Sequence, residues 1–354
     1  MAGMLPTNQG EMERLTELQH GNYLDISIFT QPDPDWDKDI LQGDTQSVHL
    51  YHTTFWANRL AAVLGAQPLY FSVTKNHEPL LRMVGLWEPL KIRRADGGVN
   101  KRNLLDKLIL RKNGKFFWTG QPIAFNGPDT SAYKSLAYSI DNYLSRNKLT
   151  LSGGDWPLEM RENLPDTWRV NQWASLKVDI TPELNTIFKN CKSSARKAVR
   201  RAETDGITVY RINHLDEFTA YYEFVQESLK ARGIKLAEFK EGVNSLWHYL
   251  RTQGIYETFI ASHNNEIIAG LSVCGYGPSF TEMAAFQSES SRRAKLYGPD
   301  LIRWKIIEWA KAQGLTSYDL AGINPVPLNN KEKNIRQFKE KWGGTYFEYL
   351  TITG

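Results

Sequence analysis

The sequence is poor in cysteine and has no long hydrophobic run. Its 354 residues include only two cysteines, Cys191 and Cys274, without CxxC spacing, so a disulfide framework is excluded and reduced thiols are expected. No apolar run approaches the roughly 20 residues that are needed to cross a bilayer. The N-terminal residues are polar and contain no signal-peptide core, which predicts a cytoplasmic protein without a transmembrane segment.

Several catalytic sequence motifs are also missing. The chain contains no GxSxG nucleophile motif, no HExxH zinc motif, no GxxxxGK[ST] phosphate loop and no GxGxxG after a predicted strand. His49 and His52 lie one helical turn apart, but no third residue with metal-ligand spacing is nearby, so they are interpreted as surface or core histidines. Hydrolase triads, zinc chemistry and dinucleotide binding therefore have little support, and no metal site is expected.

What the sequence does contain is typical of a globular protein with more than one domain. It is 41% apolar and 23% charged, with a modest formal net charge of +4. A chain of 354 residues is long for one hydrophobic core and sufficient for two domains. Residues 1–22 show no strong periodicity and are interpreted as an N-terminal tail. The irregular segment Pro157–Trp168 is the preferred linker, which predicts domains at 23–166 and 167–354.

The last third of the chain has the clearest pattern of secondary structure. A predicted strand at Phe280–Ser288 is followed by a helix from about Gly298 to Gly314, with apolar residues at a 3.6-residue period, and by a buried strand at Ser317–Leu320. Strand, helix and strand form a βαβ unit. A ligand of such a unit is expected where the first strand gives way to the helix N-terminus.

The two halves of the sequence resemble each other. FSVTKNHEPLLRMVGLW in the first half and FIASHNNEIIAGLSVCG in the second both predict a strand, an Asn-containing turn and a strand. Further on, Gly127-Pro128-Asp129 and Gly298-Pro299-Asp300 each precede a predicted helix and another strand. Two matching blocks in the same order indicate a duplicated α/β unit, with chance similarity as the alternative.

The most strongly charged segment is Lys189–Arg201, which carries six basic residues and no acidic one. The apolar spacing predicts one continuous helix from an N-cap at Thr181 to Gly206. Two interpretations stay open for the basic residues: a solvated helix face, or a phosphate-binding surface, because the planar arginine fork fits phosphate oxygens. The candidate phosphate ligands on this helix are Arg196, Lys197 and Arg200.

Three strings carry a resemblance to a known family: RKAVRRAETDGITV, IIEWAKAQGLTSYDLAG and, most sharply, FKEKWGG. They resemble the Fem family, the tRNA-dependent aminoacyltransferases that build peptidoglycan cross-bridges. The resemblance extends over nearly the whole chain but is specific mainly after Trp168. It implies an α/β fold with mixed sheets and two tandem GNAT-like acyltransferase domains, with the acceptor side at 23–166 and the catalytic, acyl-donor side at 167–354.

The resemblance assigns roles to residues of the FKEKWGG string. Lys339 corresponds to the lysine of the family's Phe-Lys pair, which is thought to steady negative charge at the transferred ester and the tRNA phosphate. One preorganised donor to a tetrahedral oxyanion can lower a barrier by about 3 kcal/mol. Phe338 is expected to pack beneath the lysine stem. Gly343 and Gly344 are expected to let the backbone approach the substrate or turn sharply into the last strand.

Two departures from related sequences bear on the acyl donor. Acyl-CoA-binding relatives hold the pyrophosphate with a [QR]xxGxG/A loop, and the matching stretch here keeps Arg293 and Gly298 but has Leu296 at the middle glycine. This bulky residue disfavours CoA without excluding it, and Arg293 and Gly298 are kept as donor-binding candidates. The coiled-coil arm of many Fem proteins has no counterpart in this sequence.

The general base and the acceptor site are less well marked. Glu282 is a candidate catalytic residue, because it is expected to share a strand face with Phe280 and Phe286, where burial raises a carboxyl pKa. Asp129 lies in a turn similar to one that lines the family's acceptor site, and a helix-stabilising role is the alternative. The candidates to line an acceptor cleft are Trp56 and Trp118, with core packing as the alternative.

Together these features predict an acyltransferase that moves an aminoacyl group, with aminoacyl-tRNA as co-substrate, to an amine of a cell-envelope precursor. One alternative is an acyl-CoA-dependent N-acyltransferase acting on an amino sugar or amino acid. Another is a non-catalytic module that binds tRNA or polysaccharide through the basic helix. No tightly bound cofactor is expected. The expected partners are tRNA and a small-molecule or nucleotide-linked precursor but not DNA, and peripheral contact with a membrane stays open.

Overall fold

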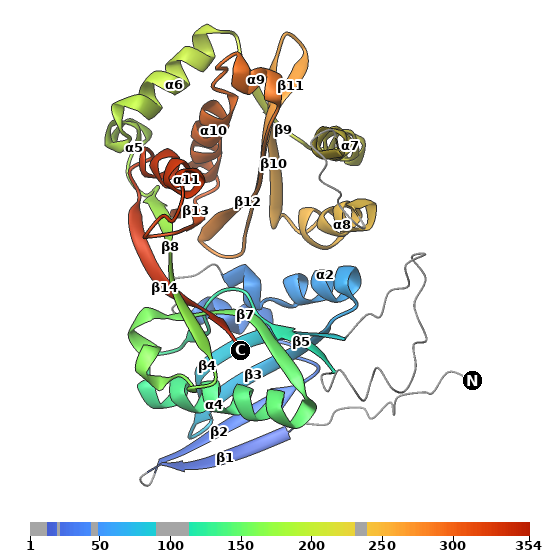
Figure 1. Ribbon diagram of the computed structural model, residues 1–354, viewed down its shortest axis with the longest axis vertical. Helices are drawn as coiled ribbons and strands as arrows, with labels where there is room; N and C mark the ends of the chain where they lie inside the picture. The colour runs from blue at the N-terminus through green and yellow to red at the C-terminus, as the bar shows by residue number, and fades with distance from the viewer. Residues whose placement is uncertain (1–12, 20–21, 44–48, 90–112, 231–238) are drawn as a thin grey trace, which may run out of the picture. The chain divides into compact units, whose positions relative to one another are not determined.

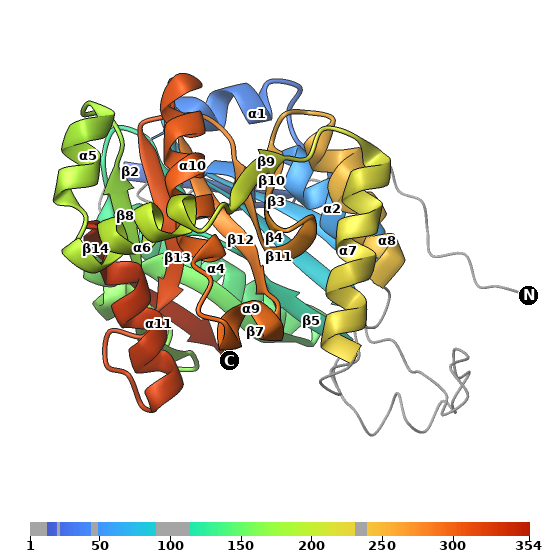
Figure 2. The same ribbon diagram turned by 90° about the horizontal axis from the view of Figure 1, so that it is seen from above.

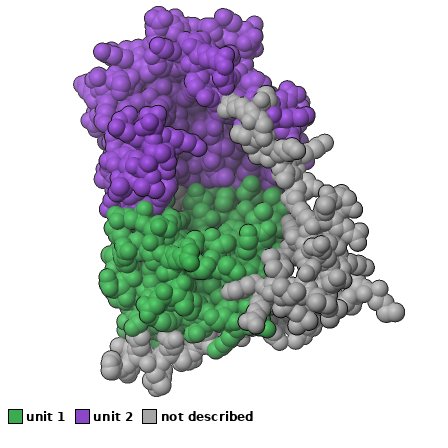
Figure 3. Space-filling model, in the orientation of Figure 1, with its two compact units in different colours: residues 1–172, 349–354 green, residues 173–348 purple. Residues whose placement is uncertain are grey.

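The structure is a computed structural model that describes residues 13–19, 22–43, 49–89, 113–230 and 239–354. The chain divides into two compact units, residues 1–172 with 349–354 and residues 173–348, which are coloured separately in Figure 3. The chain leaves the first unit after Gln172 and returns to it at Tyr349. The first unit therefore includes the C-terminal residues 349–354, which the sequence analysis placed in the second domain.

The first unit is built on a mixed sheet. Its strands are β1 (Glu13–Gln19), β2 (Asn22–Phe29), β3 (Gln67–Lys75), β4 (Glu78–Pro89), β5 (Gly114–Phe117), β6 (Ile123–Ala124), β7 (Leu149–Pro157) and the end of β14 (Thr345–Thr353). They run in the order β1-β2-β3-β4-β5-β7-β14, and β6 pairs with β4. Neighbours are antiparallel except β5 and β7, which are parallel.

Helices cover both faces of this sheet (Figure 1). They are α1 (Trp36–Asp39), η1 (Ile40–Gln42), η2 (His49–His52), α2 (Thr54–Leu64), α4 (Thr130–Asn147) and η3 (Leu158–Asn163). On one face, α4 packs on an apolar core that contains Phe71, Phe116 and Trp156. On the other face, Tyr70 of β3 contacts Trp36 of α1, with ring centroids 5.1 Å apart.

His52 lies inside the first unit, as the core interpretation of the histidines predicts. Its Nε2 donates to the carbonyl of Gln121 at 2.8 Å, and its Nδ1 accepts from the N–H of Val84 at 3.1 Å. Burial lowers the pKa of His52 to about 4, so the ring is neutral at neutral pH. Both ring nitrogens are occupied by backbone groups, and this residue has a structural role.

Two expectations about the first unit are wrong. The segment Pro157–Trp168 is not a linker, because it forms η3 and buries Met160, Leu164 and Trp168 in the core of the first unit. The assignment of residues 1–22 to a tail outside the first domain is also wrong, because Glu13–Gln19 is strand β1 and pairs with β2. Residues 1–12 and 20–21 lie outside the described residues.

The second unit is also built on a mixed sheet. Its strands are β8 (Arg169–Asp179), β9 (Thr208–Arg211), β10 (Tyr256–His263), β11 (Glu266–Gly275), β12 (Ser279–Gln287) and β13 (Ser317–Ile323). They run in the order β8-β13-β12-β11-β10-β9. Only β12 and β13 are parallel among these neighbours.

Helices cover both faces of this sheet too, as Figure 2 shows from above. They are α5 (Leu184–Asn190), α6 (Ser193–Thr204), α7 (Leu215–Lys230), α8 (Phe239–Ser245), the π-helical turn η4 (Leu246–Arg251), α9 (Glu289–Arg293), α10 (Gly298–Ala312) and α11 (Asn330–Glu340). On one face, Trp309 of α10 contacts Phe280. On the other, Phe224 of α7 contacts Phe286. No helix in the described part of the chain is long and apolar enough to span a membrane.

The two units repeat one arrangement. In each, an antiparallel hairpin leads to a strand, a helix and a second strand parallel to the first: β3-β4-β5-α4-β7 and β10-β11-β12-α10-β13. Both hairpins turn at two residues with left-handed φ, at Asn76-His77 and at Asn264-Asn265. The predicted duplication and the mixed α/β fold class are therefore confirmed.

The predicted continuous helix from Thr181 to Gly206 is wrong. The structure has two helices, α5 and α6, separated by Cys191 and Lys192 in extended conformation, with ψ of 145° and 152°. The N–H of Lys192 donates to the carbonyl of Lys341 at 2.8 Å. The helix is therefore interrupted where its backbone donates a hydrogen bond to a distant segment. The spacing of apolar residues along the sequence contains no information about such a contact.

Candidate active site

The parallel strands β12 and β13 pair over only part of their length. Their register ends at Thr281 opposite Asp319, although β12 continues to Gln287 and β13 to Ile323. A β-bulge at residues 282–284 bends β12 just beyond this point. Since the two strands are no longer paired there, side chains from α10 and α11 reach the space beside them.

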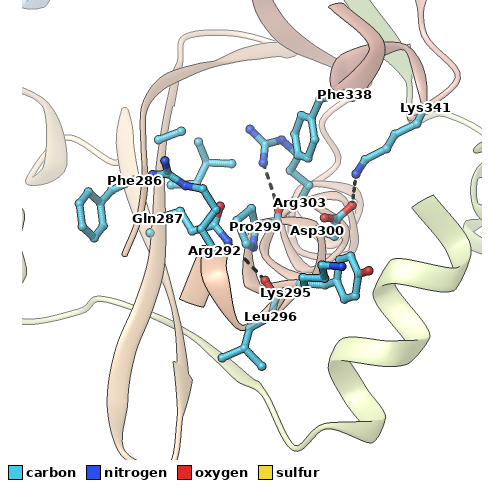
Figure 4. Close-up of a pocket in the computed structure, with 14 residues that line it drawn as sticks. Phe286, Gln287, Arg292, Lys295, Leu296, Pro299, Asp300, Arg303, Phe338 and Lys341 are labelled. Carbon is cyan, nitrogen blue, oxygen red and sulfur yellow. Dashed lines mark hydrogen bonds and ion pairs between the residues drawn. The ribbon is translucent and has the colours of Figure 1, made fainter. Parts of the chain in front are cut away.

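A cavity of about 460 Å³ lies at the N-terminus of α10 and is lined by residues of β12, the 292–297 segment and α11 (Figure 4). Four of its lining residues are basic, Arg292, Lys295, Arg303 and Lys341, and one is acidic, Asp300. The positive end of the α10 helix dipole adds to this field, although the N–H groups of Asp300 and Leu301 already donate to the carbonyl of Tyr297. The cavity is therefore suited to a phosphate or another anion, and it lies where the βαβ pattern predicts a ligand.

Two of the four cations are neutralised within the protein. The Nζ of Lys341 lies 2.5 Å from Oδ1 of Asp300, in the first turn of α10. Arg303 is paired with Glu282. Arg292 and Lys295 are exposed and form no ion pair within the described residues. These two side chains are the cations available to an incoming anion.

Arg303 and Glu282 form a buried, two-pronged ion pair under the cavity. Arg303 Nε lies 2.7 Å from one carboxylate oxygen and its Nη2 lies 2.8 Å from the other. Both side chains are almost completely buried, at 6% and 7% exposure. The hydroxyl of Tyr318 donates to the same carboxylate at 2.8 Å. With both oxygens engaged, Glu282 is poorly placed to accept a proton from a substrate.

Glu282 does not share a strand face with both of its expected neighbours. Phe280 packs on Trp309 of α10, whereas Phe286 packs on Phe224 of α7. The bulge between them interrupts the two-residue alternation on which the expectation was based.

Phe338 of α11 lines the cavity between two cations. The guanidinium carbon of Arg303 lies 4.6 Å from the centre of its ring, and the Nζ of Lys341 lies 3.9 Å from it. Both distances are within the range of cation–π attraction. The ring of Phe338 therefore contacts Arg303 and Lys341, and its expected packing beneath the stem of Lys339 stays a prediction.

Lys339 points into the protein and not into open solvent. Its Nζ donates to the carbonyl of Gly322 at the end of β13, at 3.0 Å. Burial lowers the pKa of Lys339, and the nearby carboxylates of Glu282 and Asp319 oppose that shift. The buried carboxylate of Asp319 on β13 also interacts with Lys177 of β8, so two lysines from neighbouring elements lie near one buried acid. The ammonium group of Lys339 is therefore close enough to interact electrostatically with Arg303, which lines the cavity.

Gly343 and Gly344 turn the chain into β14. Gly343 has a φ of +78°, and a Cβ there would lie 2.6 Å from the carbonyl oxygen of Asn190. A Cβ on Gly344 would lie 2.7 Å from the carbonyl oxygen of Lys177. The expected sharp turn into the last strand is therefore present. The backbone of these glycines approaches the protein itself, at α5 and β8.

Of the two donor-binding candidates near α10, neither lines the cavity. Arg293 is 79% exposed and pairs with Glu289 at 2.7 Å. Gly298 is buried at the start of α10, where a Cβ would meet Ile268 and Ala261. The neighbouring Arg292 and Lys295 line the cavity instead.

The basic run on α5 and α6 is partly neutralised by contacts that sequence spacing does not show. Arg196 donates to the carbonyls of Lys189 and Cys191 at the end of α5. Arg200 lies over the ring of Phe188, 5.7 Å from its centre. Lys197 is exposed, with no ion pair in the described part of the chain. Two further residues of the run have acidic partners: Lys192 pairs with Glu340 and Arg201 with Asp205.

The residues expected to bind an acceptor have structural contacts in the first unit. Trp56 is buried in α2 against Tyr51, with ring centroids 5.2 Å apart. Trp118 is buried in an aromatic cluster with Trp156 and Trp168. Asp129 is the N-cap of α4, because its Oδ1 accepts from the N–H of Ala132 at 2.9 Å.

Sequence reasoning missed the cavity residues Arg292, Lys295, Arg303 and Lys341. Arg292 and Lys295 lie in the basic Ser291–Lys295 turn, so the signal was present but could not distinguish Arg292 from Arg293. Arg303 lies inside an apolar helix pattern, where a single basic residue is a signal for a buried ion pair.

Asp155 of the first unit is another titratable group that the sequence did not single out. Its Oδ2 accepts from the N–H of Gly120 at 2.8 Å, and its side chain lines a second cavity beside Trp118. Burial raises the pKa of Asp155 to about 6, and the bond from Gly120 opposes the shift. The folded state therefore holds this proton more tightly than the unfolded state, in which the pKa is near 3.8.

This shift predicts that Asp155→Asn stabilises the first unit at alkaline but not at acidic pH. Wild-type stability should fall as the pH rises from about 4 to about 7, and the variant should avoid a loss of about 1–3 kcal/mol. The amide oxygen of asparagine can keep the bond from Gly120. Thermal melts of both proteins at pH 4 and pH 8 test the prediction, and an equal difference at both values would contradict it.

Comparison with known proteins identifies the fold. Residues 189–333 match the family model of the acetyltransferase (GNAT) domain. No curated protein sequence matches the chain. Among solved structures, FemX is 12% identical, with a TM-score of 0.67 over 91% of this chain and 96% of that chain.

Two other structures are similar over most of the chain. The C-terminal domain of a protein described as a lysylphosphatidylglycerol synthetase from Agrobacterium fabrum is 12% identical, with a TM-score of 0.56 over 90% of both chains. A tandem GNAT protein from the clavulanic acid biosynthesis pathway is 8% identical, with a TM-score of 0.51 over 94% of this chain and 98% of that chain. At these identities the likeness concerns the fold, which is the Fem-type tandem GNAT fold that the sequence predicts. Residues 189–333, which match the acetyltransferase domain, lie within the second unit and the segments of this fold that follow β8.

Proposed function

We propose that this chain is a GNAT-type acyltransferase that transfers an aminoacyl group from aminoacyl-tRNA to an amine of a cell-envelope precursor. The observation that carries the proposal is the cation-lined cavity at the N-terminus of α10, beside the Phe338–Lys339 pair of α11. The FKEKWGG string that contains this pair is the sharpest point of resemblance to the Fem family. The second unit would hold the donor, and the first unit would serve the acceptor.

The free cations of the cavity support a phosphate-bearing donor. Arg292 and Lys295 have no acidic partner in the described part of the chain, so an anion can bind them without displacing an existing ion pair. Arg196, Lys197 and Arg200 would give a tRNA further phosphate contacts outside the cavity. Arg196 would do so only through the donors that its two carbonyl contacts leave free.

Leu296 supports tRNA over CoA as the donor. Its side chain lines the cavity at the position where acyl-CoA-binding relatives have a glycine for the pyrophosphate. A side chain there occupies space that a closely approaching diphosphate needs. A single phosphate with an ester beyond it makes a smaller demand on that space.

The transfer itself needs little covalent chemistry from the protein. The acceptor amine attacks the ester carbonyl, a tetrahedral oxyanion forms, a C–N bond is made, and the C–O bond to the terminal ribose of the tRNA breaks. Lys339 would stabilise the oxyanion, the amine would lose its proton to a base that is not Glu282, and the ribose oxygen would take up a proton and leave as a hydroxyl group. Holding ester and amine together can lower the barrier by about 7–11 kcal/mol.

The donor assignment is tested with a double variant and a neighbouring control. Arg292→Ala/Lys295→Ala is expected to weaken the binding of charged tRNA about 10- to 100-fold, because two phosphate contacts are lost, and to reduce the dependence of binding on salt. Arg293→Ala removes an arginine that points away from the cavity and should leave binding within about twofold. Filter binding at several salt concentrations measures both.

The acyl-CoA-dependent N-acyltransferase is the second candidate, because the matched domain is described as an acetyltransferase. Its acceptor would be an amino sugar or amino acid. Stabilisation of the protein by acetyl-CoA, lost in Arg292→Ala/Lys295→Ala, together with no effect of charged tRNA, would replace the tRNA assignment by this one. The non-catalytic module has less support, because residues 189–333 match a domain that is described as an acetyltransferase.

A further inference from the structure

The loop between β13 and α11 exposes two aliphatic side chains that stand out in this protein. Val326 is 72% exposed and Leu328 is 82% exposed. The next most exposed large apolar residue in the described part of the chain is Leu215, at 45%. Single exposed apolar residues are common, but two of the most exposed ones separated by one residue call for an explanation.

The loop is held in this exposed form by its own hydrogen bonds. The carboxylate of Glu332 accepts from the N–H of Leu328 at 2.9 Å and from both Asn324 and Asn329, at 2.9 and 2.8 Å. The N–H of Val326 donates to the side chain of Asn324 at 2.9 Å. Because the backbone is fixed at these points, Val326 and Leu328 cannot fold inward without losing several bonds.

Arg336 of α11 adds a further brace to the loop. Its Nη1 donates to the carbonyl of Pro325 at 2.7 Å, and its Nε lies 2.8 Å from Glu340. Pro325 and Pro327 also restrict the backbone on either side of Val326. Two side chains of α11, Glu332 and Arg336, therefore hold the loop so that Val326 and Leu328, here called the apolar tip, are exposed to solvent.

Basic side chains flank the apolar tip. Lys331 and Lys333, in the first turns of α11, are exposed and form no ion pair within the described residues. The one acid between them, Glu332, is occupied by the loop. Exposed aliphatic side chains next to lysines are typical of a segment that binds at the surface of an anionic bilayer. The aliphatic side chains insert as far as the acyl chains, and the ammonium groups bind lipid phosphates.

We propose that the 324–333 segment, the apolar tip with Lys331 and Lys333, docks the protein on the surface of a bilayer that contains anionic phospholipid. The proposal concerns a surface outside the cavity and does not depend on which donor the enzyme uses. Two aliphatic side chains are too small a patch for a stable protein interface, which commonly buries about 1,200 Å² or more. A nucleic acid would meet this surface mainly through its phosphates, which bind lysines but not Val326 and Leu328.

The test uses the full chain and vesicles of defined composition. Wild type is expected to sediment with vesicles of 30% phosphatidylglycerol in phosphatidylcholine and much less with phosphatidylcholine alone. Val326→Ser/Leu328→Ser should lower the partition coefficient on the anionic vesicles about tenfold or more, because the apolar contribution is lost. Lys331→Gln/Lys333→Gln should lower it about tenfold on the anionic vesicles only. Leu215→Ser, an exposed apolar residue elsewhere in the second unit, is the matched control and should bind like wild type.

A second measurement reports insertion directly. The emission that Leu328→Trp adds to that of the eleven native tryptophans should be blue-shifted by anionic vesicles and quenched by brominated acyl chains, whereas Leu215→Trp should show neither change. Binding of wild type that equals the binding of Val326→Ser/Leu328→Ser would overturn the proposal, and so would an unshifted emission of Leu328→Trp. Transfer to a water-soluble acceptor should be the same in wild type and Val326→Ser/Leu328→Ser, so failure of the docking proposal can be distinguished from failure of the proposed function.

Discussion

Replacing Lys339 by methionine is expected to lower kcat for acyl transfer by about 10²- to 10³-fold. A single preorganised donor to an oxyanion accounts for a factor of this size. Methionine keeps an unbranched apolar chain of similar length, so the packing of the lysine stem is retained while the charge is lost. KM for the donor should change less than kcat, because the interaction is strongest where negative charge develops.

The stability of this variant separates a catalytic from a structural role of Lys339. Burial lowers the pKa of Lys339 because it disfavours the charged ammonium group. Removing that group relieves this desolvation cost, which offsets the loss of the hydrogen bond to Gly322. The melting temperature of Lys339→Met should therefore stay close to that of wild type. Lys333→Met, an exposed lysine of the same helix, is the control and should keep full transfer to a water-soluble acceptor. A Lys339→Met enzyme with activity within threefold of wild type would remove the proposed role.

The largest effect on stability is expected from Arg303→Met. It leaves the carboxylate of Glu282 buried without its ion-pair partner, with the hydrogen bond from Tyr318 and the more distant charge of Lys339 remaining. Breaking one side of a buried ion pair costs about 3–5 kcal/mol. It also removes one of the two cations that contact Phe338. The variant should unfold at a clearly lower urea concentration in the transition of the second unit.

A double variant tests whether the buried charge is the cause. Arg303→Met/Glu282→Met removes both charges, so it should recover most of the stability lost in Arg303→Met, even though each change alone is harmful. The exposed pair of Arg293 and Glu289 is the comparison, since removing it should change the free energy of unfolding by less than about 1 kcal/mol. Additive losses in the double variant would show that packing, and not charge, is responsible.

The failures of sequence reasoning in the second unit have a common cause. Arg292 and Arg293 are adjacent and chemically identical, and only the path of the chain from β12 to α10 directs one to the cavity and the other to Glu289. The partner of Glu282 lies on α10, 21 positions away in the sequence. The break at Cys191 and Lys192 depends on the backbone of Lys341. In each case the deciding contact comes from a segment that no local pattern includes.

What the sequence alone determined is the repeated α/β unit, its hairpins and the starts of α4 and α10, because these depend on signals within a few residues. Asn76 and Asn264 tolerate left-handed φ, Asp129 caps its own helix, and apolar periods of two and 3.6 residues separate strand from helix. Only the tertiary structure decided which charges are free and which are paired. A charge is neutralised by whatever lies within a few ångströms of it, and packing between distant segments sets that distance.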